Sequence, residues 1–547
     1  MKKSILLKIT SLSLVAIMML FAVGCDLEAI FGDIDVDGNG QYEDFSNIYN
    51  QMSDKIPSEG DGKFTAIMGE PSFAFPPSYN EQLDFEEEEI AILYRDYIQN
   101  SREWYKATPE DELDEAIAMR NEKVQDELNV KIVWYPVASN GNDYTEYTTR
   151  FHDMVTNDVL SGTHYYDISA NFGYPTTSSN IRDYTTNLLD TSLFPYFNFE
   201  LPCWNQSIVE NTTFDGRLHY IAGDVNLSMF DAAVVVWHNK SLYDEKKLDT
   251  DPENMQQLAL DGLWTYDELY RWTSVFYENT NFTDAGKDVN DTYALLAAQT
   301  SGAPMPRDAF PYAWDLNFVI TNDDGTHSFD IKGNRKIEEA LIKCRNLLRG
   351  PGTFDTSSAQ IFAEGTAIFY MERLYAGYDA NMAIREMEDK YGLLPMPKYN
   401  TNQEQYATTS QDYYNLMFVL DHLDSDTPTK GDAVSAFLQY STELTHSDVL
   451  GYYFNRIVTP KFFGTDDSEG TVTRSIAIFD IIINNIKFDY CYIYRSQLNN
   501  INHLWLFATD PGSSNANDTF EKIYSADELN FTKAIKDTDT WLGLRSY

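Results

Sequence analysis

Basic residues and cysteines are both scarce in this sequence. Its 40 Lys and Arg residues are outnumbered by 85 Asp and Glu residues, which gives a formal net charge of −45. Because so acidic a surface repels phosphate backbones, we expect no nucleic-acid partner. Only four cysteines occur, and only three widely spaced ones follow residue 25; three thiols cannot form a complete disulfide framework, and none lies in a C-x-x-C pair. One disulfide among Cys203, Cys344 and Cys491 is left open.

Catalytic signatures are missing as well. The sequence contains no G-x-S-x-G elbow, no H-E-x-x-H, no phosphate-binding glycine loop and no dinucleotide fingerprint, and none of its eight histidines is spaced as a metal pair. Pairs of carboxylates, which a glycosidase uses, are abundant, but 85 acids produce such pairs by chance. We therefore predict that the protein is not an enzyme and needs no cofactor. An extracellular glycoside-active enzyme is the alternative.

Only one long hydrophobic run is present, and it lies at the N-terminus. Residues 9–23 (ITSLSLVAIMMLFAV) follow three lysines. The run is shorter than the roughly 20 residues that a membrane span needs, and it is typical of a signal peptide core. It ends in Ala22-Val23-Gly24-Cys25, which resembles the bacterial lipobox. We predict a lipoprotein signal peptide over residues 1–24 and a lipid anchor on Cys25; a signal peptide cleaved elsewhere is the alternative.

The rest of the chain has the composition of a globular protein. No later stretch is long and apolar enough to cross a bilayer, so we expect everything after Cys25 to lie on the extracellular face of the cell membrane. A hydrophobic content of 43% and an aromatic content of 14% predict packed cores rather than disorder. A chain of 547 residues is too long for one such core, so two or more folding units are expected.

Residues 25–62 are expected to form an acidic tether. They contain the string DIDVDGNGQYEDF (33–45), whose acids alternate as in an EF-type calcium loop. Two registers fit in part: one places Gly40 where an apolar residue is usual, and the other places Ser46 where the final glutamate belongs. Too few apolar residues precede the string for an entry helix. Two interpretations stay open, a solvated tether or a weak calcium site with the candidate ligands Asp33, Asp35, Asp37, Asn39, Glu43 and Asp44.

Strand and helix patterns alternate in the first half of the chain. KFTAIMG (63–69) has the pattern of a strand, and the segment after Thr108-Pro109 has that of a helix start. NVKIVWYPV (129–137) is predicted to be a buried strand. A second helix ends near Gly162, and YYDISA (165–170) is predicted to be the next strand. This order predicts a parallel sheet covered by helices.

The alternation returns after residue 230. AAVVVWH (232–238) is the most strand-like segment of the chain, and helices are predicted over 262–276 and 335–348. Further strand candidates are 367–371, 392–396 and 415–420, and from residue 431 the pattern is mainly helical.

Several segments form a further pattern when they are taken in order. They are DEAIAMRNEKVQDELNVKIVW (114–134), YYDIS followed by NLLD (187–190), GRLHYIAGDVNLS (216–228), VVVWHNKSLYDE (234–245), GLWTYDEL (262–269), IFAEGTAIFY (361–370) and YGLLPMPKYN (391–400). Together they resemble the extracellular solute-binding proteins of ATP-driven (ABC) importers, most closely the large carbohydrate-type members with the maltose-binding-protein-like, type 2 architecture. The resemblance covers residues 113–500, and after residue 446 the sequence follows the family pattern only loosely.

The resemblance implies a fold and a mode of action. The expected fold is α/β and two-lobed, periplasmic-binding-protein-like (type 2), with two mixed sheets flanked by helices, a hinged cleft and a helical C-terminal region. Lobe one is expected over 63–230 and 386–446, and lobe two over 231–385 and 447–547. A monomer of this kind captures a solute, here a sugar or oligosaccharide, by hinge closure and delivers it to ABC permease subunits.

Candidate ligand contacts follow from the chemistry of sugars. A sugar cleft needs aromatic plates and planar polar groups, and α/β crevices bind ligands at strand ends. Residues of these types after predicted strands, or in segments that match the cleft of the family, are Asn171, Tyr174, Trp204, Trp314, Asp315, Tyr370, Glu372, Arg373, Asp412, Tyr413, Tyr414 and Trp505. For each of them, packing in the core or a place on the surface is the alternative.

Two further functions are left open beside the sugar receptor and the enzyme. One is a receptor for a peptide or another polar solute. The other is a glycan-binding surface lipoprotein of the outer-membrane starch-utilisation type, which takes no part in transport. That type is built mainly of helical repeats, so the strand patterns at 165–170 and 232–238 argue against it.

Overall fold

The computed structural model describes part of the chain in detail. These residues are 83–97, 101–139, 144–177, 182–280, 286–299, 305–377, 383–411, 414–423, 428–457 and 469–544. All of them belong to one compact unit, Lys55–Tyr547. The predicted signal peptide, Cys25, the acidic string 33–45 and the predicted strand 63–69 lie outside the described residues.

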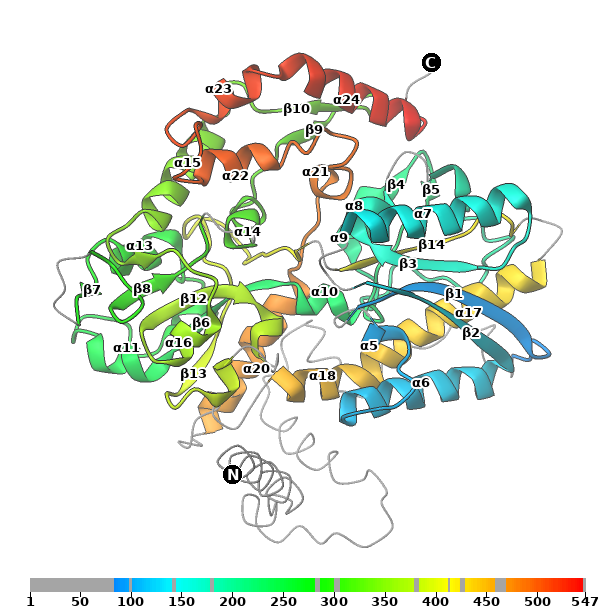
Figure 1. The fold of residues 1–547 in the computed structure, drawn as a ribbon, viewed down its shortest axis with the longest axis horizontal. Coiled ribbons are helices and arrows are strands. Elements are labelled where there is room, and N and C mark those ends of the chain that lie inside the picture. The colour runs from blue at the N-terminus through cyan, green and yellow to red at the C-terminus, as the bar shows by residue number, and fades with distance from the viewer. Residues whose placement is uncertain are drawn as a thin grey trace, which may run out of the picture. The chain divides into compact units, whose positions relative to one another are not determined.

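Four strands form the first sheet, in the order β14–β3–β1–β2 (Figure 1). β1 (Glu88–Asp96), β2 (Val130–Ala138) and β3 (Ile168–Phe172) run parallel, and β14 (Asn415–Val419) is antiparallel to β3. The helices α6 (Glu112–Leu128), α7 (Tyr144–Ser161) and α17 (Pro428–Leu444) pack beside these strands. Removal of apolar side chains such as Ile90, Ile92 and Val124 from water holds this layer together.

The first sheet agrees with the predicted pattern in part. The strand at 129–137 and the helix before it are confirmed, although the helix cap is Asp111, whose carboxylate accepts the Asp114 N–H at 3.0 Å. β1 was not predicted, because its segment starts with the acids Glu86–Glu89, and the apolar residues that follow were assigned to a polar stretch.

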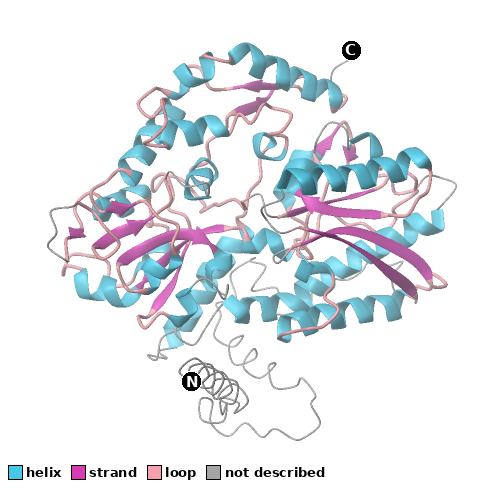
Figure 2. Ribbon diagram, in the orientation of Figure 1, coloured by secondary structure: helices cyan, strands magenta, loops and turns pink. Residues whose placement is uncertain are grey.

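Six strands form the second sheet. Figure 2 shows the strands in magenta and the helices around them in cyan. The path β11–β8–β12–β6–β13 joins Thr353–Phe354, Thr292–Leu296, Ala367–Arg373, Val234–Asn239 and Tyr391–Leu394, and β7 (Tyr277–Glu278) pairs with β8. β11, β8 and β12 are parallel, whereas β6 is antiparallel to both β12 and β13. β6 and β12 are buried along their whole length, which explains their continuous apolar runs.

Two segments carry the chain between the two sheets, and a third segment, which follows the helix at 469–484, pairs with them. We call 231–234, 407–411 and 485–489 the first, second and third crossing. Ala233 in the first crossing forms an antiparallel bridge with Ser410 in the second, and Thr408 in the second forms a parallel bridge with Ile486 in the third. Two mixed α/β sheets joined in this way are the two-lobed, type 2 periplasmic-binding-protein-like fold that the sequence predicts.

The predicted lobe boundaries differ from the sheets in two places. β13, which lies in the range assigned to lobe one, pairs with β6 in the second sheet. The π-helical turn η5 (Thr445–Val449), which the predicted boundary at 446 divides, and α18 (Leu450–Ile457), assigned to lobe two, pack against α6 of the first layer. Both errors have the same cause. The boundaries were placed where the strand and helix pattern of the sequence changes, but the chain passes between the lobes some residues away from those points.

The C-terminal region is helical, as predicted. α20 (Glu469–Asn484) packs against α12 (Met255–Leu260) and β13, and α21 (Tyr490–Ile493), α22 (His503–Thr509), α23 (Phe520–Ser525) and α24 (Glu528–Trp541) follow the third crossing. Within the described ranges, no helix has the length and apolar character needed to cross a membrane.

Shorter elements complete the two layers. They are α5 (Ser101–Trp104), α8 (Gly173–Thr176), η2 (Arg182–Tyr184), α9 (Gln206–Thr212), β4 (Thr213–Phe214), β5 (Arg217–Leu218), α10 (Leu227–Asp231), α11 (Lys240–Lys246), α13 (Tyr266–Thr273), α14 (Met305–Ala313), β9 (Val319–Thr321), β10 (His327–Phe329), α15 (Arg335–Leu348), α16 (Ala359–Ala363), η3 (Leu374–Gly377) and η4 (Ala383–Glu386).

Candidate ligand site

The carboxyl ends of strands from both sheets meet the crossings. After β12, the Leu374 N–H donates to the Ala233 carbonyl oxygen of the first crossing at 2.9 Å. After β3, the Gly173 N–H donates to the Tyr414 carbonyl oxygen, just beyond the second crossing, at 3.1 Å. In α/β sheets the crevice outside the carboxyl ends of the strands is the usual ligand site. The ends of β3 and β12 therefore define the candidate site.

The first-lobe part of this site is a buried polar cluster. The Asn171 side chain is 1% exposed, and its Oδ1 accepts the Tyr147 hydroxyl at 2.7 Å. Its amide nitrogen has no hydrogen-bond partner among the described residues. On β1, the Arg95 guanidinium lies 3.1 Å from the ring centroid of Phe172, a cation–π contact. This end of the sheet thus combines a carboxamide, a cation and an aromatic ring.

The second-lobe part of the site is an ion pair at the end of β12. Arg373 Nε lies 3.1 Å from Glu372 Oε1, and both side chains are buried. The Tyr370 hydroxyl donates to the Ser357 carbonyl oxygen at 2.8 Å and contacts Glu372 Oε2 at 3.3 Å. Burial raises the pKa of Tyr370 well above its ordinary value, so the phenol stays protonated. The cluster is held rigidly, as a recognition site requires.

Tyr414 lies beside the end of β3 and packs against the third crossing. Its ring centroid is 4.5 Å from that of Phe488 in the third crossing, and the ring is stacked on Tyr492 of α21. A Cβ at Gly173 would lie 2.3 Å from the Tyr414 ring, so only glycine fits at the end of β3. Tyr414 is 1% exposed and packs the crossings against α21.

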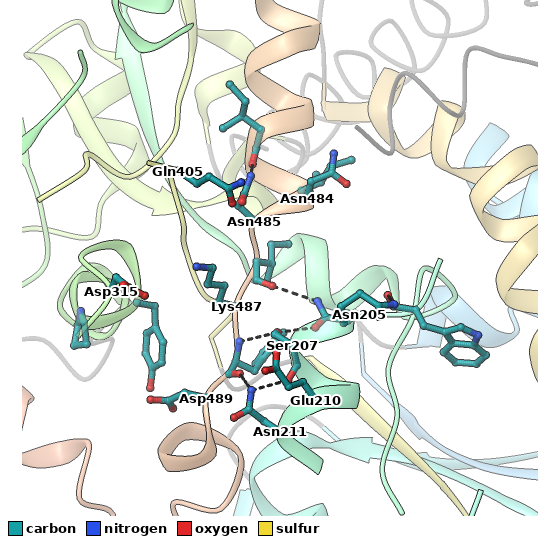
Figure 3. Close-up of a pocket in the computed structure, with 18 of the residues that line it drawn as sticks. Asn205, Ser207, Glu210, Asn211, Asp315, Gln405, Asn484, Asn485, Lys487 and Asp489 are labelled. Carbon is teal, nitrogen blue, oxygen red and sulfur yellow. Dashed lines mark hydrogen bonds between the residues drawn. The ribbon is translucent and has the colours of Figure 1, made fainter. Parts of the chain in front are cut away.

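A cavity of about 900 Å³ runs along the third crossing (Figure 3). Its walls come from α9 of the first lobe, the C-terminal end of α14 of the second, and the end of α20. Its polar lining residues are Asn205, Gln206, Ser207, Glu210, Asn211, Asp315, Asn317, Gln405, Asp480, Asn484, Asn485, Lys487 and Asp489. Both lobes contribute, so a change in their relative orientation changes this cavity.

Side chains of α9 hold the third crossing. Asn205 Nδ2 donates to the Ile486 carbonyl oxygen at 3.3 Å, and Asn211 Nδ2 donates to the Phe488 carbonyl oxygen at 3.2 Å. The Phe488 N–H donates to Ser207 Oγ at 3.0 Å. Figure 3 shows these bonds as dashed lines between the helix and the crossing. The third crossing is therefore fixed to the first lobe as far as Phe488.

The short helix α21 follows directly after Phe488 and still contacts the first lobe, where the Thr177 hydroxyl donates to the Ile493 carbonyl oxygen at 2.6 Å. Asp489 caps α21 by accepting the Tyr492 N–H at 2.7 Å, and burial raises the pKa of this carboxyl to about 6. Around it the cavity carries the carboxylates of Glu210, Asp315 and Asp480 and a single ammonium, that of Lys487. This lining favours neutral or cationic solutes over anionic ones.

The structure does not bring all predicted contacts together. Asn171, Tyr370, Glu372, Arg373 and Tyr414 lie at the strand ends described above. Trp204 and Asp315 line the cavity instead; the indole is fully buried and donates to Gln439 Oε1 at 3.1 Å, while Asp315 is exposed.

Two tryptophans and three other predicted contacts remain. Trp314 is fully buried and donates to the Pro397 carbonyl oxygen at 3.1 Å, and Trp505 packs on Phe318 and Phe520. In this structure both indoles have packing roles, because neither has a face open to a ligand. Asp412, Tyr413 and the side chain of Tyr174 lie outside the described residues. The ligand role of every residue in the set stays a prediction.

Several residues of the site were missed by the sequence analysis. Arg95 was missed with its strand, although an arginine at the end of an apolar run is a usable signal. Lys487 and the polar side chains of α9 gave no sequence signal, because their proximity depends on the third crossing. Among the described residues, no cluster of three metal-binding side chains occurs, and Cys203, Cys344 and Cys491 are buried and form no disulfide with one another.

Comparison with known proteins gives structural neighbours but no sequence relatives. No family model matches the chain, and no curated protein matches it. An ABC substrate-binding protein from Listeria monocytogenes, solved with cycloalternan, is 13% identical with a TM-score of 0.47, over 82% of this chain and 99% of its own. A sugar transporter protein from Rhizobium etli in an open conformation is 12% identical with a TM-score of 0.49, over 82% and 99%. The galacto-N-biose/lacto-N-biose I-binding protein from Bifidobacterium longum is 12% identical with a TM-score of 0.48, over 84% and 99%.

Proposed function

We propose that the chain is the solute-binding receptor of an ABC importer and that it binds a carbohydrate. One observation carries the proposal: two crossings join two α/β sheets, a third segment pairs with them, and strand ends from both sheets meet at these paired segments. A solute held between such ends contacts both lobes, so it stabilises the closed arrangement by its extra contacts there. The ordered sequence segments that resemble this receptor family support the same function.

The chemistry of the site supports a sugar as the solute. Carboxamides, carboxylates and arginine hydrogen-bond in a plane and match vicinal hydroxyls, and Asn171, Glu372 and Arg373 supply these groups at the strand ends. The acidic lining along the third crossing disfavours acidic sugars. We propose a neutral or amino-bearing sugar, bound without hydrolysis.

The remaining parts of the proposal concern the location of the protein. Acylation of Cys25 would anchor the receptor on the extracellular face of the cell membrane, beside two permease subunits that accept the solute. A calcium ion bound by the string 33–45 would stiffen the tether. These features rest on the sequence, since residues 1–82 lie outside the described residues.

A binding screen with product analysis tests the proposal. Purified full-length chain is titrated calorimetrically with neutral mono- and oligosaccharides, glucosamine oligomers, uronic acid oligomers and short peptides, and each mixture is then chromatographed. We expect binding of at least one neutral or amino sugar at micromolar concentration or below, with the sugar recovered intact. Binding of peptides alone would show that the solute is a peptide and not a carbohydrate. Release of shorter sugars would refute the receptor function in favour of an enzyme.

A further inference from the structure

Glu103, in the short helix α5, is buried at the base of the hinge. Its side chain is 0% exposed. Its Oε2 accepts the Ser228 N–H at 2.9 Å, and its Oε1 accepts a hydrogen bond from the Asn415 side-chain amide. The Ser228 side chain also hydrogen-bonds to this carboxylate. Each of these groups donates to the ionised carboxylate.

The donors belong to segments that lead into two crossings. Ser228 lies in the first turn of α10, which runs directly into the first crossing, and Asn415 begins β14 shortly after the second crossing. Ser228 and Asn415 are also joined to each other, because the Asn415 N–H donates to Ser228 Oγ at 3.1 Å. Glu103, Ser228 and Asn415 therefore form a closed triangle that connects the bases of the first and second crossings.

Charged groups surround the triangle on the elements that pack against α5. From α6, Arg120 Nη2 donates to the Glu103 carbonyl oxygen at 2.9 Å. From α10, Asp231 accepts the Tyr453 hydroxyl at 2.8 Å. On β1, Arg95 lies on the ring of Phe172, and the strand ends at Asp96. Asp224, two residues before Asn226, forms a buried pair with His446, in which Oδ2 and Nδ1 are 2.6 Å apart.

The Glu103 carboxyl changes its protonation state within the ordinary range of pH. Burial raises the pKa of its carboxyl to about 7, although the hydrogen bonds from Ser228 and Asn415 lower it. An ionised carboxylate accepts from all of its donors. A protonated one adds a hydroxyl hydrogen to a ring of donors in which only the Ser228 hydroxyl can turn to accept it, so at least one of the hydrogen bonds that the carboxylate accepts is lost or reversed.

We propose that Glu103 is a positioning residue for solute binding: its ionised carboxylate holds the bases of the first and second crossings together, and its protonation loosens them and weakens the affinity for the solute. Glu103 itself does not contact the solute. The inference rests on the proposed function, because solute affinity is its main readout. It adds a pH dependence that originates at a residue outside the ligand site.

The test compares the pH profiles of solute affinity. The dissociation constant of a neutral sugar found in the screen is measured between pH 6 and pH 8 for the full chain and for Glu103→Gln. For the unaltered chain we expect binding about fivefold weaker at pH 6 than at pH 8, the size of an ordinary coupling between sites. Gln presents an amide to the same donors, so the variant should bind at the weak level at every pH. Equal profiles for both proteins would overturn the proposal.

Two further variants separate Glu103 from other titrating groups. Glu443 on α17 is also buried, with a pKa raised to about 7, but it is bonded to Gln439 on its own helix at 2.5 Å. Glu443→Gln should keep the pH profile of the unaltered chain. His446→Gln should keep it as well, and a flat profile in that variant would assign the effect to the histidine and refute the role of Glu103.

A readout without a solute distinguishes failure of this inference from failure of the proposed function. Hydrogen exchange of the Asn415 amide is followed at pH 6 and pH 8 and corrected for the intrinsic chemical rate. We expect protection about fivefold lower at pH 6 in the unaltered chain and no change with pH in Glu103→Gln. If no sugar binds but this difference is present, the positioning role stands without the sugar; if sugar binds and the difference is absent, the inference alone fails.

Discussion

Removing the Ser207 hydroxyl should weaken the attachment of the third crossing to the first lobe. This oxygen accepts the Phe488 N–H at 3.0 Å, and Phe488 is 1% exposed. A buried N–H without a partner costs about 1–3 kcal/mol, and water from the adjoining cavity can replace part of the lost bond. We therefore expect Ser207→Ala to lower the free energy of unfolding by about 1 kcal/mol.

The assay is urea denaturation combined with hydrogen exchange at Phe488. Ser241→Ala is the matched control, since Ser241 Oγ accepts the Lys390 N–H at 2.9 Å at an exposed site where water can replace it. The control should lose less than about 0.5 kcal/mol. The Phe488 amide should exchange faster in Ser207→Ala only. Equal losses in both variants, with unchanged exchange, would show that α9 does not hold the crossing.

Three other predictions concern acid stability, recognition and the tether. Burial lowers the pKa of His238 to about 3 from its ordinary 6.5, so the unfolded chain binds more protons than the folded chain between these pH values, and stability falls as the pH drops through that range. His238→Phe should reduce the loss of thermal stability between pH 7 and pH 5. An unchanged dependence of the unfolding temperature on pH would count against this prediction. Arg373→Leu should weaken sugar binding at least about tenfold by breaking the ion pair with Glu372. The control Arg271→Leu, which breaks a half-exposed ion pair with Asp251, should leave the affinity unchanged. Similar effects of both variants would show that Arg373 takes no part in sugar binding. Deletion of residues 27–58 should leave sugar affinity unchanged, and a large loss in calorimetry would show that the tether takes part in binding.

The sequence predicted correctly those helices and strands whose apolar residues recur at a regular spacing along the chain. The strand at 129–137, the helix before it and the apolar strand β6 are dictated by continuous or helical spacing of apolar residues. β1 was missed because a strand needs no favourable composition at its exposed start, where Glu88 and Glu89 precede the buried residues. The lobe boundaries were misplaced because pairing partners such as β6 and β13 are distant in sequence.

The candidate site was predictable only where it follows a strand. Asn171 and Arg373 were proposed because they lie near predicted strand ends, and parallel strands bring such ends together; their ligand role stays a prediction. Trp314 was an expected plate, but it is fully buried, since a large aromatic residue after an amphipathic helix packs inside as readily as it faces a cleft. Glu103 gave no signal at all, because its partners Ser228 and Asn415 come from distant parts of the chain.

Distance measurement across the hinge tests the central claim most directly. Leu160 in the first lobe and Val275 in the second are 72% and 77% exposed, and the three described cysteines are buried, so Leu160→Cys and Val275→Cys accept spin labels in a Cys25→Ser background. We predict that a saturating sugar from the screen shifts the distance between the labels to a new, narrower distribution, as closure about the three crossings requires. Tight sugar binding with an unchanged distance distribution would contradict the account.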